Sequence, residues 1–456
     1  MPGAEAKPHG DHMTRLREER EQRGWTKTSL VHKLERAAAA QGVGVATRKS
    51  LLRMLAQWEN GHREVGEPYR TLMPIVYRLE PAELGLGASS NGTNSKLGLG
   101  FESSLAATLV IVEELAKYDL LGHTAIVQGK FAPDALNAAV LDWMFAAPSS
   151  DVEGGRREVT ARHVAEVQAT TQAFDRLDRQ FGGEHSRELA TKYLRDAVVP
   201  MLRGRYAEGV GHDLFSAAAA LCELIGWMAY DADRHALAQR YFTQGLRLAS
   251  QAGDDAYGAF LLASMGHQAL YLKQPAQALR LAQAAYDRSS RTSSAAMLTE
   301  AAFLTARAYS ELGDASGCGS ALKRAEDAYE RIRPDTEPAW ATNIDETIFA
   351  SHAGTCWTRL DRPAQALPFL RTLWDNSADQ ARRRAYAAVQ LATVADQEGD
   401  LERAGMLGIQ AAEAISQVPS ARSKHELAAL LRRLETKKDH PLIRDLHERA
   451  RLVLAD

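Results

Sequence analysis

Donor-bearing side chains share one face of the helix that the sequence predicts over residues 48–61. Leu51, Leu55 and Trp58 are spaced i, i+4 and i+7, which is typical of the buried stripe of an amphipathic helix. Arg53 and Gln57 are four residues apart, so they lie together on another face. Both side chains offer donors that can pair with purine edges in the major groove of DNA. The spacing therefore predicts a surface suited to base recognition.

Charge is distributed unevenly along the chain, whose formal net charge is −3. Residues 13–80 contain 13 Lys and Arg against 8 Asp and Glu, a net charge of +5, whereas residues 1–12 carry −1 and the residues after 80 carry −7. A basic segment ahead of an acidic remainder is typical of a protein that binds a polyanion at one end. A chance fluctuation in composition is the alternative explanation.

The sequence carries no enzyme signature. It has no Gly-rich phosphate loop ending in Gly-Lys-Ser/Thr, no His-Glu-x-x-His and no Gly-x-Ser-x-Gly. Several histidines are scattered without a recognisable spacing: His123, His163, His185, His212 and His267. We therefore expect a protein that is not an enzyme, with no catalytic residue and no cofactor.

The cysteines and the apolar segments argue against a zinc protein, a membrane protein and a secreted protein. Cys222, Cys318 and Cys356 are widely separated and have no paired Cys/His spacing that would hold zinc, so we expect reduced core thiols and no metal site. The longest apolar-leaning run, residues 105–112, is far shorter than the roughly 20 residues that cross a bilayer. Residues 1–12 lack the apolar region of a secretory signal. We expect a cytoplasmic protein with no membrane association.

A repeat of helical hairpins is the main structural pattern. Small residues recur at three aligned positions in five units, 12 and then 7 residues apart, and 14 of these 15 positions hold a small residue. Antiparallel helices that cross closely need small side chains at the crossing. The units begin 40, 40, 48 and 38 residues apart. The aligned residues are Gly226, Gly266, Ala306, Gly354 and Ala392, then Ala238, Ala278, Cys318, Ala366 and Ala404, then Gly245, Ala285, Ala325, Leu373 and Ala411.

The first helices of these units carry aromatic and polar side chains that would line a concave face. Such a mixture suits a peptide or a small effector, although a solvated inner surface or a dimer contact is equally compatible with it. The candidate effector-binding residues are Trp227, Tyr230, His267, Arg307, Thr355 and Tyr386, with Thr393 beside them.

Two resemblances accompany these patterns. Trp58-Glu59-Asn60-Gly61, followed by Pro68-Tyr69, resembles the Cro/repressor (Xre) helix-turn-helix family, and the small/Ala/Ala pattern resembles the tetratricopeptide repeat, whose usual period is 34. A helix-turn-helix segment followed by tetratricopeptide-like repeats is similar to the layout of a class of actinobacterial regulators. The stretches that most resemble this class are residues 226–231, 235–242 and 264–269.

The Xre resemblance implies a set of DNA-binding residues. It places Lys49, Ser50, Arg53 and Gln57 on the DNA-facing side of the recognition helix. Lys27, Thr28, His62 and Arg63 are assigned to phosphate contacts. The separation of Leu30 from Trp58, 28 positions, is about twice the usual one, so we expect a lengthened helix and loop in place of the tight turn. The full set is Lys27, Thr28, Arg48, Lys49, Ser50, Arg53, Gln57, His62 and Arg63.

These observations predict an all-α protein with a helix-turn-helix domain followed by a tetratricopeptide-like helical-hairpin solenoid. We expect a disordered tail (1–12), a DNA-binding domain (13–84), a flexible Gly/Ser/Asn linker (85–100), a connecting region (101–210) and a repeat domain (211–456). The expected function is sequence-specific binding of double-stranded DNA as a homodimer, with an effector sensed by the repeats. The alternative is a protein-interaction scaffold with a degenerate head.

Overall fold

The computed structural model describes residues 14–41, 43–60, 65–66, 68–79, 81, 83–84, 86, 96–127, 129–145, 155–181, 183–290, 292, 294–338, 341, 344–417 and 421–455. Within these residues the chain is all-α, as predicted, and has no strand beyond an isolated bridge between Glu158 and Arg205. The chain divides into two compact units: Met1–Lys96 with Tyr118–Ala125, and Leu97–Lys117 with Ile126–Asp456. Helices α1–α4 are called the head below, and helices α8–α23 the body.

The head is built from α1 (Arg15–Gln22), α2 (Lys27–Ala40), α3 (Arg48–Glu59) and α4 (Tyr69–Tyr77). Gly24, at φ +64°, follows the end of α1, and the Thr26 side chain caps α2 by accepting from the Ser29 amide. The long α2 and the residues between it and α3 replace a tight turn, as the sequence predicted. Leu51, Leu55 and Trp58 of α3 lie in the core of the head, which confirms the predicted buried stripe.

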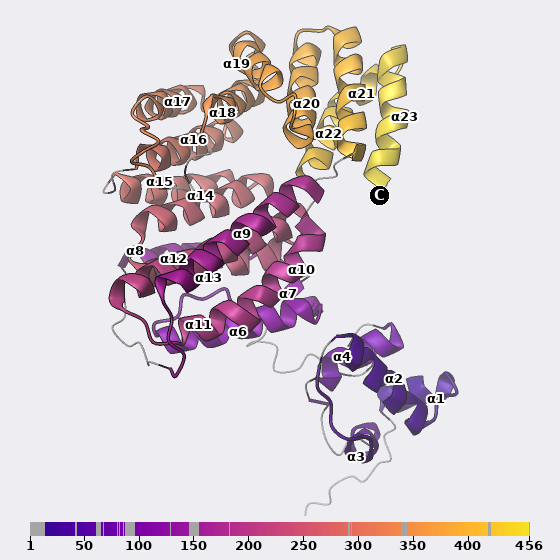
Figure 1. The fold of residues 1–456 in the computed structure, drawn as a ribbon. Helices are drawn as coiled ribbons and strands as arrows, with labels where there is room; N and C mark the ends of the chain where they lie inside the picture. Colours follow the sequence, from indigo (N-terminus) through magenta and orange to yellow (C-terminus); the bar gives the residue numbers. More distant parts are fainter. Residues whose placement is uncertain are drawn as a thin grey trace, which may run out of the picture. The chain divides into compact units, whose positions relative to one another are not determined.

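The body consists mainly of antiparallel helix pairs, which Figure 1 shows stacked one on another. Each first helix also contacts the first helix of the next pair, so the hairpins form a repeat. The five pairs are α12 (Glu208–Asp231) with α13 (His235–Ala252), α14 (Asp255–Tyr271) with α15 (Pro275–Ser289), α16 (Ala295–Glu311) with α17 (Ala315–Tyr329), α18 (Glu346–Arg359) with α19 (Pro363–Asp375), and α20 (Ala381–Gln397) with α21 (Leu401–Gln417).

Further helices flank the pairs on both sides. The body ends with α22 (Ala421–Leu434), the 3₁₀ turn η3 (Glu435–Lys437) and α23 (Pro441–Ala455). Before the pairs come α6 (Leu105–Leu120), α7 (Thr124–Val127), α8 (Pro133–Phe145), α9 (Ala161–Phe181), α10 (Gly183–Tyr193), the π-helical turn η1 (Leu194–Val198) and α11 (Val199–Leu202). Helices α9 and α10 pack on α12, and α8 packs on α13 and α15.

Close contact at the small residues explains the pairing. A Cβ at Gly226 would lie 2.5 Å from Cε1 of Phe242 on the paired helix, and a Cβ at Gly354 would lie 2.6 Å from Cδ2 of Leu370. At Gly266 a Cβ would clash with the side chain of Leu304 on α16, in the next pair. The aligned residues of the second helices are buried as well, and Cys318 is one of three buried free thiols, as predicted.

The predicted linker lies partly outside the described residues, since residues 87–95 are not among them. Its last residues form turns that are bound to the body. The Gln244 side-chain amide of α13 donates to the carbonyls of Gly98 at 3.1 Å and Gly100 at 3.0 Å. Gly98 has φ +75°, and a Cβ there would lie 3.3 Å from Cβ of Arg240. This end of the segment is therefore held by specific contacts.

Helix α12 is long and apolar enough, by length and composition, to cross a membrane. However, 78% of its most apolar window is buried by the rest of the body, and it pairs with α13 along its length. This environment is that of a core helix. Its apolar residues are interrupted by polar ones, so a search for uninterrupted apolar runs in the sequence does not find it.

We predict that Gly226→Ala destabilises the body by about 1–3 kcal/mol, because the buried Phe242 ring leaves no room for a methyl group. Urea unfolding followed by circular dichroism measures the change. Gly319→Ala is the matched control: a Cβ at this helical position of α17 meets only Trp357, at 3.8 Å. It should stabilise by about 0.5–1 kcal/mol, since alanine restricts the unfolded chain more than glycine does. Equal effects of the two substitutions would contradict the proposed close packing.

Candidate functional site

The exposed face of α3 is the first candidate site. Lys49 and Arg53 are exposed, Gln57 is half-buried, and the hydroxyl of Ser50 accepts a hydrogen bond from Thr47 at 3.2 Å. Among the described residues, neither Arg53 nor Gln57 has a side-chain hydrogen-bond or ion-pair partner. Because the opposite stripe of α3 is buried in the core of the head, these donors are held on a fixed surface and remain free to bind.

A buried ion pair fixes α3 to α1. The Arg20 guanidinium donates to both carboxylate oxygens of Glu59, at 2.5 and 3.1 Å, and its third nitrogen donates to the Trp25 carbonyl at 2.7 Å. Glu59 is fully buried and Arg20 is 7% exposed. The Thr14 hydroxyl also donates to the Glu59 carbonyl at 2.9 Å. In the sequence Glu59 stands out only as part of a motif, and no local pattern indicates that Arg20 binds it.

The remaining predicted DNA-binding residues have varied surroundings. Lys27 Nζ lies 3.5 Å from Glu59 Oε2, beside the buried pair. Arg48 is bound to Glu35 of α2, with Nε 3.1 Å from Oε1. Thr28 is exposed in the first turn of α2. His62 and Arg63 lie outside the described residues. Among the predicted residues of α3, Lys49, Arg53 and Gln57 are therefore the ones whose side chains the structure leaves available.

The second candidate site follows the first helices of the body, where the predicted effector-binding residues form two groups. In the first group, Trp227 of α12 lies against Tyr230 and against His267 of α14, with ring centroids 5.1 and 6.2 Å apart. In the second, the hydroxyls of Thr355 on α18 and Tyr386 on α20 lie 2.8 Å apart. Thr355 is fully buried and Tyr230 is 4% exposed, because neighbouring helices cover them, so these two do not line an open groove.

A His–Glu–His cluster connects the two groups and was missed by sequence reasoning. His267 Nε2 lies 2.8 Å from Oε1 of Glu300 on α16, and one ligand atom each of His267, Glu300 and His352 on α18 lie within 4.8 Å of one another. The three residues are 33 and 52 positions apart, so no local spacing reveals them. The repeat pattern, which predicts that α14, α16 and α18 pack side by side, is the signal that could have indicated their proximity.

The electrostatics of this cluster favour a carboxylate beside neutral imidazole. Burial raises the pKa of Glu300, but the hydrogen bond from His267 and neighbouring positive charge, to which Arg307 contributes, outweigh it and lower the pKa to about 2. Burial lowers the pKa of His352 to about 3, so its ring is neutral at physiological pH. His352 stacks on Phe303 with ring centroids 4.6 Å apart and an interplanar angle of 4°, which orients the ring.

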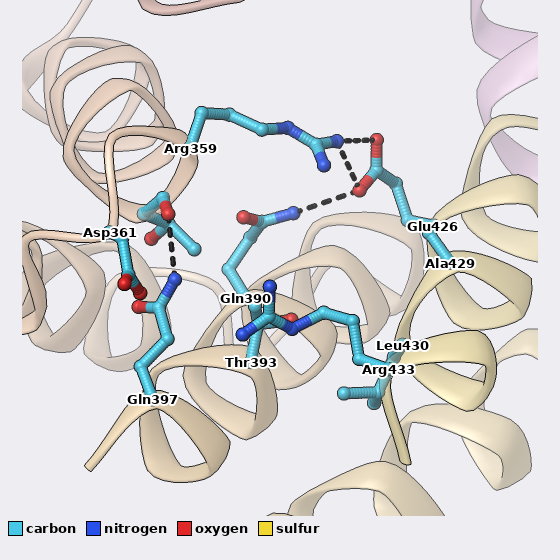
Figure 2. A pocket seen from close by; sticks show the side chains of 10 residues that line it. Arg359, Asp361, Gln390, Thr393, Gln397, Glu426, Ala429, Leu430 and Arg433 are labelled. Carbon is cyan, nitrogen blue, oxygen red and sulfur yellow. Dashed lines mark hydrogen bonds and ion pairs between the residues drawn. The ribbon is translucent and has the colours of Figure 1, made fainter. Parts of the chain in front are cut away.

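A small polar hollow lies next to these groups, between α18, α20 and α22. Figure 2 shows Arg359 and Gln390 converging on the carboxylate of Glu426, at 2.7 and 3.3 Å. The hollow has a volume of about 110 Å³, below the roughly 300–1,000 Å³ of typical small-molecule pockets. It includes Thr393 but none of the six main predicted residues. Its lining is Thr358, Arg359, Asp361, Gln390, Thr393, Gln397, Glu426, Ala429, Leu430 and Arg433.

Comparison with known proteins assigns no family to this fold. No protein-family model matches the chain, and no curated protein matches its sequence. Any functional assignment therefore depends on the geometry of the two candidate sites.

We predict that Glu59→Gln destabilises the head by about 3–5 kcal/mol, because it leaves the Arg20 guanidinium buried without its counter-charge. Amide hydrogen exchange of the full chain measures this separately for α1–α4 and for the body. Arg17→Gln, which removes the exposed Arg17–Glu21 pair of α1, should leave the exchange of α1–α4 nearly unchanged, because exposed ion pairs contribute little to stability. Unchanged protection of α3 in Glu59→Gln would show that the ion pair does not hold this helix.

Proposed function

We propose that this protein is a sequence-specific DNA-binding transcription regulator that binds double-stranded DNA through α3. The observation that carries the proposal is the arrangement of α3, whose apolar stripe is buried while Lys49, Arg53 and Gln57 remain available on its surface. The net charge of +5 over residues 13–80, against −7 after residue 80, supports the same function, since phosphates attract a basic surface.

The sequence resemblances agree with this proposal. The Trp58-Glu59 end of α3 is similar to the Xre helix-turn-helix family, and the helix pairs of the body are compatible with a tetratricopeptide-like solenoid. A recognition helix reads only a few base pairs, so we propose a homodimer that binds paired half-sites. This function places the protein in the cytoplasm. The long connection between α2 and α3 departs from the usual motif, and α3 is the helix that we assign to the major groove.

A protein-interaction scaffold with a degenerate head is the competing function, because helical-hairpin repeats commonly present binding surfaces. The two functions differ in their response to salt. A DNA-binding head releases counterions from the phosphates, so its affinity for duplex DNA falls steeply as the salt concentration rises. A scaffold shows no such dependence, and fluorescence anisotropy of the full chain with labelled duplex measures it.

We predict that Arg53→Ala lowers the affinity for the specific site by about 1–3 kcal/mol and relaxes specificity at one base pair of each half-site. Genomic mapping of the tagged protein identifies the site, and anisotropy with single-base variants measures the specificity. Arg15→Ala, which removes an exposed arginine of α1, is the control and should leave specificity unchanged. If Arg53→Ala weakens specific and random DNA equally, Arg53 contacts phosphate and our assignment of its role is wrong.

We further propose that the first helices of the body sense an effector near His267 and Arg307. His267 lies 2.8 Å from Glu300, and Arg307 interacts electrostatically with Tyr386, Glu300 and His352. Replacing His267 and Arg307 together with alanine should abolish regulation of a reporter in cells, while the purified protein still binds its site. Regulation that persists in the double variant would exclude this part of the body as the sensor.

A further inference from the structure

Three consecutive first helices of the body each direct one metal-ligating side chain to a common point. His267 comes from α14, Glu300 from α16 and His352 from α18. Contacts between α14 and α16 and between α16 and α18 hold these helices side by side. The three ligand atoms lie within 4.8 Å of one another, which is close enough for one ion to bridge them after a small adjustment.

The carboxylate of Glu300 is the buried acidic group of the cluster. Glu300 is 7% exposed, and burying a carboxylate requires a compensating partner. His267 supplies one partner, at 2.8 Å.

One ring nitrogen of His352 has no hydrogen-bond partner among the described residues to account for its burial. Its Nδ1 is buried and has no hydrogen-bond partner within the described part of the chain. A buried polar atom without a partner usually indicates a bound water or ion. A water would satisfy the ring nitrogen alone, whereas a metal ion would engage the imidazole together with the carboxylate and the second imidazole, all of which face the same point.

We propose that His267, Glu300 and His352 bind one divalent transition-metal ion of the Zn²⁺ type. Two imidazoles and one carboxylate form a common three-ligand set for zinc, with a water in the fourth position. Bonds of about 2.0–2.1 Å place tetrahedral ligands about 3.3 Å apart, so the widest pair must approach by roughly 1.5 Å. The partial exposure of His267, 17%, leaves a path for the ion and its water.

Arg307 provides an electrostatic test of this site. It lies on α16 seven residues beyond Glu300, and its positive charge contributes to lowering the pKa of both Glu300 and His352. The same charge repels a bound cation, so neutralising it should strengthen metal binding. A site for an anionic ligand would respond in the opposite way. The metal site does not depend on whether the head binds DNA.

The experiment titrates metal-free full-length protein with Zn²⁺ in the presence of a competing chromophoric chelator. We expect one ion per chain, and Co²⁺ in place of Zn²⁺ should give the visible spectrum of a site with nitrogen and oxygen ligands. Glu300→Gln and His352→Gln should each weaken binding by at least about 100-fold, more than the loss of an outer partner. His163→Gln, at the start of α9, is the control and should bind as the unmodified chain does. Arg307→Gln should bind several times more tightly.

Three results would overturn the proposal. The first is the absence of a bound ion in the unmodified protein, together with the absence of a Co²⁺ spectrum; these measurements need no variant and so do not depend on whether one folds. The second is Zn²⁺ binding that His352→Gln leaves intact in a protein whose circular dichroism is unchanged, which would place the ion elsewhere. Weaker binding in Arg307→Gln would likewise contradict a cation site.

Discussion

Helices of the body approach one another closely at glycine positions, where no Cβ separates them. This packing constraint fixes where the side chains of the first helices lie. At Gly226 and Gly354 the space of a Cβ is already taken by a buried side chain of the paired helix, and at Gly266 by one from the next pair. Because interiors are packed as densely as organic crystals, such contacts leave little freedom in the distance between axes. Successive first helices therefore lie side by side, which brings side chains of neighbouring repeats such as His267 and Glu300 into contact.

In the head, the buried ion pair of Arg20 and Glu59 sets the orientation of α3 relative to α1. Burying Glu59 and Arg20 adds little net stability compared with apolar residues of similar size, because both ions lose their hydration. The gain is orientation: the planar guanidinium binds both oxygens of Glu59 and the Trp25 carbonyl, so α1, the turn after it and the end of α3 have one relative arrangement. The base-reading role that we propose for α3 would need such rigidity, since a shift of one residue would present different donors.

Ion pairs between charged side chains connect the later helices of the body with one another. Arg359 is bound to Glu426 and lies 3.2 Å from Glu311, so it connects α18 with α16 and α22. Asp396 of α20 binds Arg433 and Lys437, which connects the last helices in the same way. These ion pairs join neighbouring repeats, and connections of this kind are what the proposed sensing by the body requires.

Local patterns in the sequence determined the helical class, the hairpin repeat and the buried stripe of α3, because helix periodicity, capping residues and small residues at crossings act over a few positions. Thr26, Gly24, Leu51 and Trp58 illustrate this, since each does in the structure what its neighbours in sequence predicted. The resemblance of the head to a family and the roles of Arg53 and Gln57 stay predictions. Tertiary structure alone decided that Arg20 meets Glu59 and that His267, Glu300 and His352 meet one another. These contacts join residues 33 to 85 positions apart, and such distances are closed by the packing of whole helices, which no local pattern specifies.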